Sequence, residues 1–106
     1  MKDGIYLLTF KSQDKDFGSG ILVVDDSVVN GGDITYSYNG IIEENRLVLS
    51  LNKHNVNVHS LFGDFGSLKL NLSFQEDIQG YILHGNVENL QSVPLLVQAK
   101  LIGRIE

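Results

Sequence analysis

The sequence contains no cysteine and no tryptophan, and only one proline among its 106 residues. The absence of cysteine excludes a disulfide scaffold, a zinc ribbon and a thiol nucleophile. With one proline there is no proline-rich linker to separate two domains. We therefore expect a single domain over residues 1–106, of a size that buries roughly two-thirds of the surface of the unfolded chain.

Basic residues are also few: eight Lys and Arg stand against thirteen Asp and Glu, which gives a formal net charge of −5. This balance argues against direct binding of nucleic acid, because affinity for phosphate comes from Lys and Arg. No apolar run approaches the roughly 20 residues that span a bilayer, so no membrane association is expected. The first residues enter a strand-like segment without the apolar stretch of a signal peptide, and we expect a cytoplasmic protein.

Hydrophobic residues alternate with polar ones through most of the chain. A period of two places alternate side chains on opposite faces of a strand, and so predicts half-buried antiparallel strands. The predicted inward residues are Leu47, Leu49 and Leu51; Leu68, Leu70, Leu72 and Phe74; Leu95, Val97, Ala99 and Leu101; and Ile34, Tyr36 and Tyr38.

Short segments rich in Asn, Asp and Gly separate these strands, as hairpin turns require. Regularly spaced short strands with such turns favour an all-β sandwich or barrel of about eight strands. The predicted strands are 4–11, 19–24, 27–30, 33–39, 40–44, 46–54, 67–74 and 79–87, with a last one at 94–103. The alternation stops at 60–66, where Ser60 is placed to cap one short helical turn near 60–65 that would plug an end of a barrel.

Three segments are apolar on both faces: Ile5–Phe10, Ile21–Val24 and Tyr81–Leu83. Each is either covered on both sides or presents its outer face to another surface. A subunit interface is the natural candidate for that surface, which predicts a homodimer.

The sequence offers no recognisable catalytic, metal or cofactor site. His54 and His59 match no zinc-binding spacing, and His84 stands apart from both. The segment 14–25 lacks the glycine of a calcium loop, and Gly18–Gly20 is too short to be a nucleophile elbow. No nucleophile, base and orienting residue occur at a known spacing, so we expect a protein that is not an enzyme.

The segment Asn30-Gly31-Gly32-Asp33 lacks the lysine and the following helix of a phosphate-binding loop. We interpret it as a hairpin turn, in which the paired glycines supply the positive φ angles. Glu43 and Glu44 are adjacent on a strand and would point to opposite faces, so they do not form a catalytic carboxylate pair. They predict an exposed acidic turn, with recognition of a protein as its functional alternative.

Four short motifs in the first forty residues resemble a bacterial family. They are Asp3-Gly4-Ile5-Tyr6, Gly18-Ser19-Gly20-Ile21, Gly31-Gly32-Asp33 and the tyrosine-rich Tyr36-x-Tyr38-x-Gly40. The sequence is similar here to the GrlR-like family, which is named for a negative regulator of type III secretion genes, and the later strands fit in length and pattern out to Leu101. Gly31-Gly32-Asp33 followed by the tyrosine-rich strand is the most specific part.

The resemblance implies a small lipocalin-like β-barrel, in which strands run up and down, that forms a homodimer. It also implies repression through capture of a transcription activator, without direct contact with DNA. In the member that gives the family its name, an acidic surface loop after the tyrosine-rich strand is linked to partner binding. The matching residues here, Glu43, Glu44, Asn45 and Arg46, form a shorter and less acidic segment, and Arg46 reverses the sign of the charge at its end.

A second hypothesis is a barrel that binds a small apolar ligand. A closed barrel of about eight strands has an interior just wide enough for its own side chains or for one small molecule. Leu47, Leu49, Leu68 and Leu70 would line such a site, with Leu61 and Phe65 near its mouth. A filled core is the alternative that we favour, because 106 residues leave little internal volume.

Overall fold

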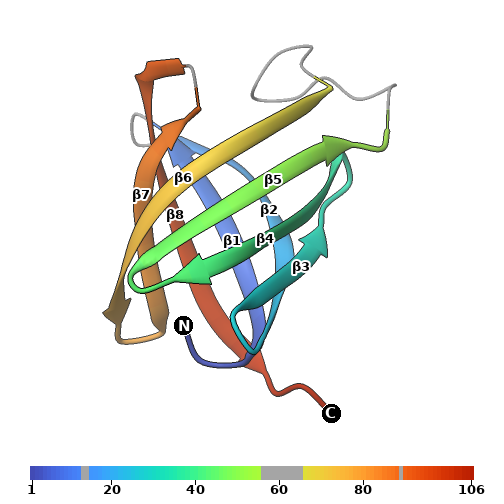
Figure 1. The fold of residues 1–106 in the computed structure, drawn as a ribbon, viewed down its shortest axis with the longest axis vertical. Helices are drawn as coiled ribbons and strands as arrows, with labels where there is room; N and C mark the ends of the chain where they lie inside the picture. The colour runs from blue at the N-terminus through green and yellow to red at the C-terminus, as the bar shows by residue number, and fades with distance from the viewer. Residues whose placement is uncertain (13–14, 56–65, 89) are drawn as a thin grey trace.

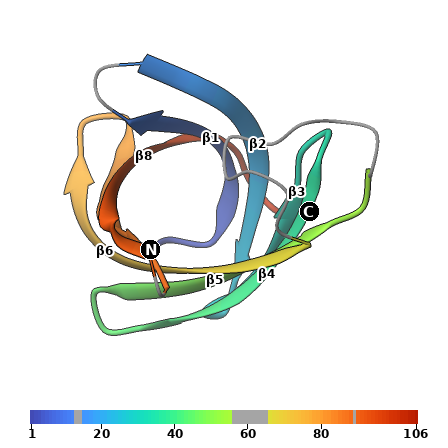
Figure 2. The same ribbon diagram turned by 90° about the horizontal axis from the view of Figure 1, so that it is seen from above.

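The computed structural model describes residues 1–12, 15–55, 66–88 and 90–106, which form a closed barrel of eight antiparallel strands (Figure 1). Each strand pairs with its neighbours in the sequence, and β1 pairs with β8 to complete the ring (Figure 2). The strands are β1 (Gly4–Ser12), β2 (Lys15–Asp25), β3 (Val28–Gly32), β4 (Tyr36–Glu43), β5 (Arg46–Lys53), β6 (Ser67–Asp77), β7 (Gly80–Val87) and β8 (Leu90–Gly103). The predicted all-β, up-and-down barrel of about eight strands is confirmed.

The predicted strands at 33–39 and 40–44 are in fact the single strand β4. Gly40 lies in the middle of β4 and does not end it. A Cβ atom at this position would overlap the carbonyl oxygen of Val48 in β5, so glycine allows the two backbones to approach closely. The predicted helical turn near 60–65 lies outside the described residues, and none of the described residues is helical.

The alternating side chains predicted to face inward form most of the core. Leu47, Leu49 and Leu51 of β5 are at most 1% exposed, and the inward residues of β6 and β8 pack against them. Leu101, at the end of its strand, is 42% exposed. Ile34 is a wrong prediction: it lies in the connection between β3 and β4, where it is 73% exposed.

The segment Asn30-Gly31-Gly32-Asp33 was also assigned wrongly as a hairpin turn, because its first three residues belong to β3 and neither glycine has a positive φ. A Cβ atom at Gly31 would overlap the carbonyl oxygen of Ile21, so close contact with β2 requires the glycine. The left-handed residues of this region are instead Asp26 and Ser27, with φ angles of 52° and 66°. Two consecutive positive φ angles are what a two-residue type I′ turn requires.

The up-and-down strand order groups the turns of the barrel into two sets, one at each end. Successive strands run in opposite directions, so every second turn lies at the same end. The lower end in Figure 1 holds the β2–β3, β4–β5 and β6–β7 turns together with both termini. The β3–β4 connection lies at the opposite, upper end. No helix long and apolar enough to cross a bilayer occurs in the part of the chain that the structure describes.

Candidate functional site

The four residues predicted to bind a partner form the β4–β5 turn at the lower end. Glu43 pairs with Arg46 at the base of the turn, and Glu44 has a φ of 54°. The carbonyl oxygen of Asn45 accepts a hydrogen bond of 2.9 Å from the backbone N–H of Phe74, which holds the turn against β6. All four side chains are exposed. The turn is therefore fixed by its backbone and leaves its charged groups free to face solvent.

The β4–β5 turn is one of three acidic turns at this end. The β2–β3 turn carries Asp25 and Asp26, and the β6–β7 turn follows Glu76 and Asp77. Asp3 also lies here, and its Oδ1 accepts a hydrogen bond of 2.9 Å from the backbone N–H of Asp26. Eight of the chain's thirteen acidic residues are thus exposed at the lower end: Asp3, Asp25, Asp26, Glu43, Glu44, Glu76, Asp77 and the C-terminal Glu106. Basic side chains of the same end are Lys2, Arg46, Lys100 and Arg104.

Sequence reasoning identified only the Glu43–Glu44 pair. The acidic pairs at 25–26 and 76–77 lie far from it in the chain, and they come together because alternate turns of an up-and-down barrel share an end. Acidic pairs recurring at alternate turns were the signal that could have indicated this surface. We call the turns at 25–28, 43–46 and 77–80 the acidic turns.

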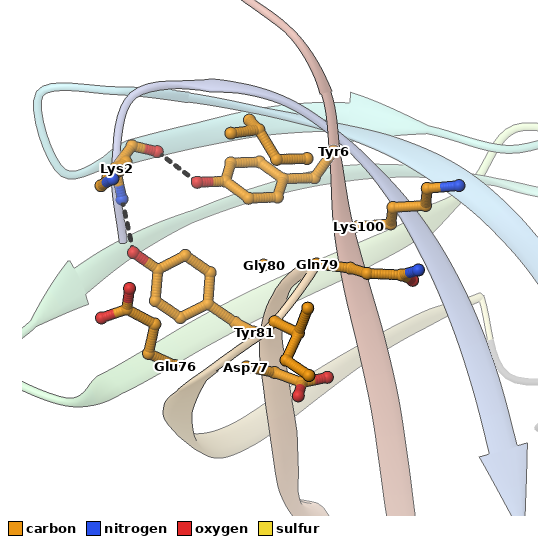
Figure 3. A pocket seen from close by; sticks show the side chains of 10 residues that line it. Lys2, Tyr6, Glu76, Asp77, Gln79, Gly80, Tyr81 and Lys100 are labelled. Carbon is orange, nitrogen blue, oxygen red and sulfur yellow. Dashed lines mark hydrogen bonds between the residues drawn. The ribbon is translucent and has the colours of Figure 1, made fainter.

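A pocket of about 350 Å³ opens at the lower end, between the β6–β7 turn, the end of β8 and the residues that precede β1 (Figure 3). Charged side chains of both signs surround it, namely Lys2, Glu76, Asp77 and Lys100, while Ile78 and Leu101 contribute apolar surface. Ile78 is 99% exposed at the tip of its turn. The lining is therefore amphipathic.

Two tyrosines hold the backbone of Lys2 across the side of this pocket (Figure 3). The hydroxyl of Tyr6 donates a hydrogen bond of 2.6 Å to the carbonyl oxygen of Lys2, and the N–H of Lys2 donates one of 3.0 Å to the hydroxyl of Tyr81. Burial, with smaller contributions from Tyr81 and Asp3, raises the pKa of Tyr6 to about 12. Tyr6 therefore stays a neutral donor at physiological pH, and it serves to position the segment before β1.

The Gly31-Gly32-Asp33 motif and the tyrosine-rich strand meet at the upper end of the barrel. The Oδ1 atom of Asp33 accepts hydrogen bonds from the N–H groups of Thr35 and Tyr36, at 2.7 and 2.6 Å, and its Oδ2 accepts one from the hydroxyl of Tyr38. Burial and the hydrogen bond to Asp33 raise the pKa of Tyr38 above its ordinary value of 10. In the motif that carries the family resemblance, Asp33 thus holds the backbone of the β3–β4 connection and also binds the hydroxyl of the buried Tyr38.

Gly20 completes this arrangement from β2. A Cβ atom at Gly20 would overlap the hydroxyl of Tyr38 and lie 2.9 Å from its ring atoms, so only glycine leaves room for the buried tyrosine. His54 lies beside the same connection, with its Nε2 atom 2.8 Å from the carbonyl oxygen of Asp33. Among the described residues, no group of three or more His, Cys, Asp and Glu is arranged to hold a metal ion. His59 lies outside the described residues.

The four leucines expected to line an apolar ligand site are packed in the core. Leu47, Leu49 and Leu70 are at most 1% exposed, and Leu68 is 9% exposed. The pocket described above lies instead at the lower end, where the lining is charged as well as apolar. Leu61 and Phe65, expected near the mouth, lie outside the described residues.

No protein-family model matches the chain, and no curated protein matches it in a search by sequence.

Proposed function

We propose that this protein is a non-enzymatic regulator that binds a partner protein through the acidic turns. The observation that carries the proposal is the gathering of three acidic turns at one end of a rigid barrel. Short turns on a rigid scaffold are a common location for recognition residues. A concentrated negative surface steers a basic partner toward it and repels the phosphates of nucleic acid.

The resemblance to the GrlR-like family suggests which kind of partner this protein binds. The partner would be a transcription activator, captured in the cytoplasm of a bacterium and so kept from its DNA. A DNA-binding protein presents a basic surface, and the carboxylates of the acidic turns would compete with DNA phosphates for it. No catalytic step is proposed. The perturbed tyrosines Tyr6 and Tyr38 are held protonated as structural donors, which suits neither for the role of a base.

Charge reversal at one acidic turn tests this function. Glu43→Lys/Glu44→Lys is compared with wild type and with Glu88→Lys, an exposed acidic residue that follows β7 at the other end of the barrel. Tagged proteins are used to recover partners from native lysate, and the recovered proteins are identified by mass spectrometry. We expect a partner with a basic DNA-binding domain to be recovered by wild type and Glu88→Lys and lost with the double variant. Equal recovery of the same partner by all three would reject a role for this turn.

We propose further that the protein is a homodimer formed through the outer face of β1 and β2. Ile5 pairs with Val23 and Leu7 with Ile21, and all four side chains point away from the core as one apolar block. Ile21 is 38% exposed, while Leu96 on the outer face of β8 is 40% exposed and provides a matched control. In light scattering at micromolar concentration we expect a dimer for wild type and Leu96→Lys and a monomer for Ile21→Lys. A monomeric wild type would reject the dimer.

The pocket at the lower end supports a second candidate function, the binding of a small molecule. The exposed apolar surface of Ile78 and Leu101 beside four charged groups suits an amphipathic ligand with an apolar body and a polar head. Native mass spectrometry of the purified protein tests this candidate. A bound small molecule that is lost in Leu101→Lys supports it, and a wild-type protein that carries no adduct opposes it.

A further inference from the structure

The outer faces of β3, β4 and β5 carry an apolar row that neither the core nor the proposed dimer face uses. Val28 pairs with Ile41, and Ile41 pairs with Val48, so the three side chains stand side by side on adjacent strands. Val28 is 48% and Ile41 49% exposed, and Val48 is half-buried. Their neighbours Val29, Ile42 and Leu47 point inward and are buried. We call Val28, Ile41 and Val48 the outer row.

The two edges of the outer row differ in charge. At its β2 end the row meets Asp25, which pairs with Val28 and is followed in the turn by Asp26. Toward the lower end Glu43 and Glu44 lie beyond Ile41, and Glu43 pairs with Arg46, which lies beyond Val48. Toward the upper end the next outward residues are Asn30, Asn39 and Ser50, a paired row of neutral side chains that the exposed Lys69 continues on β6. An occupant of this face therefore meets apolar contacts in the middle and carboxylates at the β2 end and on the lower flank, where Arg46 is the basic side chain. On the upper flank it meets neutral polar groups, with Lys69 beyond them on β6.

The spacing of the outer row matches a helix that lies across the strands. Neighbouring strands are about 4.7–4.9 Å apart, so the three side chains follow one another at that interval over about 10 Å. Residues three or four apart on one face of an α-helix are separated by about 4.5–6 Å along its axis. A crossing helix can thus set one apolar side chain against each strand. In an extended peptide, alternate residues are about 6.6–6.8 Å apart, so its side chains do not match the spacing of the three strands.

We propose that the outer row docks a basic amphipathic helix of the partner protein. The apolar stripe of this helix lies on Val28, Ile41 and Val48. Its Lys or Arg residues face Asp25 and Asp26 at the β2 end of the row and Glu43 and Glu44 on the lower flank. This inference rests on the proposed function. It adds that the partner binds through a helix, and it identifies the outer row as the surface to which that helix binds. Charge complementarity selects the occupant, because the carboxylate flank favours a basic helix and repels an acidic one.

A synthetic peptide of about 18 residues tests the inference directly, since shorter isolated helices are marginal in water. It has leucines three and four residues apart along one face and lysines on the other. Two control peptides are used: one of the same composition in which the leucines share no face, and one with glutamate in place of lysine. Binding to the purified protein is measured by fluorescence anisotropy, and the binding surface is mapped by amide chemical shifts in NMR spectra.

We expect the amphipathic basic peptide to bind wild type at least tenfold more tightly than either control peptide. Val28→Ser/Ile41→Ser should weaken binding about tenfold or more, since each residue loses a half-exposed apolar side chain that the helix would cover. Leu96→Ser, at 40% exposure on β8, should leave the affinity within twofold of wild type. The shifted amides should centre on β3, β4 and β5. Thermal unfolding of each variant verifies that it is folded.

Other outcomes overturn the inference. Equal affinity for all three peptides, or no effect of Val28→Ser/Ile41→Ser, would reject a helix on the outer row. A change of oligomeric mass in Ile41→Ser would assign the row to a second copy of this chain. If Glu43→Lys/Glu44→Lys binds the peptide as wild type does while Val28→Ser/Ile41→Ser does not, the outer row stands as an apolar docking surface. The pairing of the helix with Glu43 and Glu44, and the role proposed for the acidic β4–β5 turn, then both fail.

Discussion

Replacing Asp33 by alanine should be among the most damaging single changes in the described part of the barrel. Its carboxylate accepts hydrogen bonds from the N–H groups of Thr35 and Tyr36 and from the hydroxyl of Tyr38. These three partners are only 7%, 2% and 2% exposed. Alanine would remove the acceptor of three hydrogen bonds in a partly buried part of the molecule.

The expected loss follows from the number and kind of bonds. A hydrogen bond to a charged group contributes about 1.5–3 kcal/mol, and the loss of several at one site is less than their sum because the connection can rearrange. We expect Asp33→Ala to lower the free energy of unfolding by about 3–4 kcal/mol. Tyr38→Phe removes one donor and keeps the ring, and we expect it to lose about 1–2 kcal/mol.

Urea unfolding of wild type, the two single variants and the double variant measures these values and their coupling. Because the Tyr38 hydroxyl has Asp33 as its partner, the double variant should be more stable than the sum of the single effects predicts, by about 1 kcal/mol. Asp25→Ala, at an exposed turn, serves as a control and should change stability by less than about 0.5 kcal/mol. A loss below about 1 kcal/mol for Asp33→Ala, or the absence of coupling, would refute the structural role of the motif.

Two further predictions concern titration and close packing. The folded-state pKa of Tyr6 is about 12 against an ordinary value of 10, so the neutral hydroxyl stabilises the fold fully below pH 10 and this contribution is lost as the pH rises from 10 toward 12. Thermal unfolding across that range should show a smaller decline for Tyr6→Phe than for wild type, and an equal decline would contradict the assignment. Gly31→Ala should destabilise the barrel by about 2 kcal/mol or more in urea unfolding, because its methyl group would overlap the carbonyl oxygen of Ile21; Gly66→Ala, where a Cβ atom meets open space, should change stability little.

The sequence pattern was sufficient to predict most of the strands and most of the core. Inward residues such as Leu49 and Leu70 follow from a period of two, which is a local property of the chain. Ile34 continued the same period but lies in a connection, where alternation no longer determines which side chains are buried. The family resemblance indicated a barrel where the pattern alone left a sandwich equally open.

The roles of the glycines were harder to predict, because they depend on which backbones meet. Gly31 and Gly40 are required by contact with β2 and β5, and the sequence alone does not state those pairings. The candidate site has the same limitation. Glu43 and Glu44 were identifiable as an acidic turn, but their grouping with Asp25, Asp26 and the β6–β7 turn depends on strand order.

Closure of the sheet also decides how this protein can be recognised. Because β8 pairs with β1, each of the eight described strands pairs with two neighbours, and none of them has a whole side unpaired. In the described part of the barrel, a partner that added a strand would meet only part-length edges, such as Lys15–Gly20 of β2 on the side of β3. The closed sheet therefore favours recognition by side chains on the outer faces and at the ends. Substitutions at exposed positions such as Ile41 and Glu44 can then alter the choice of partner while the hydrogen-bonded frame stays unchanged.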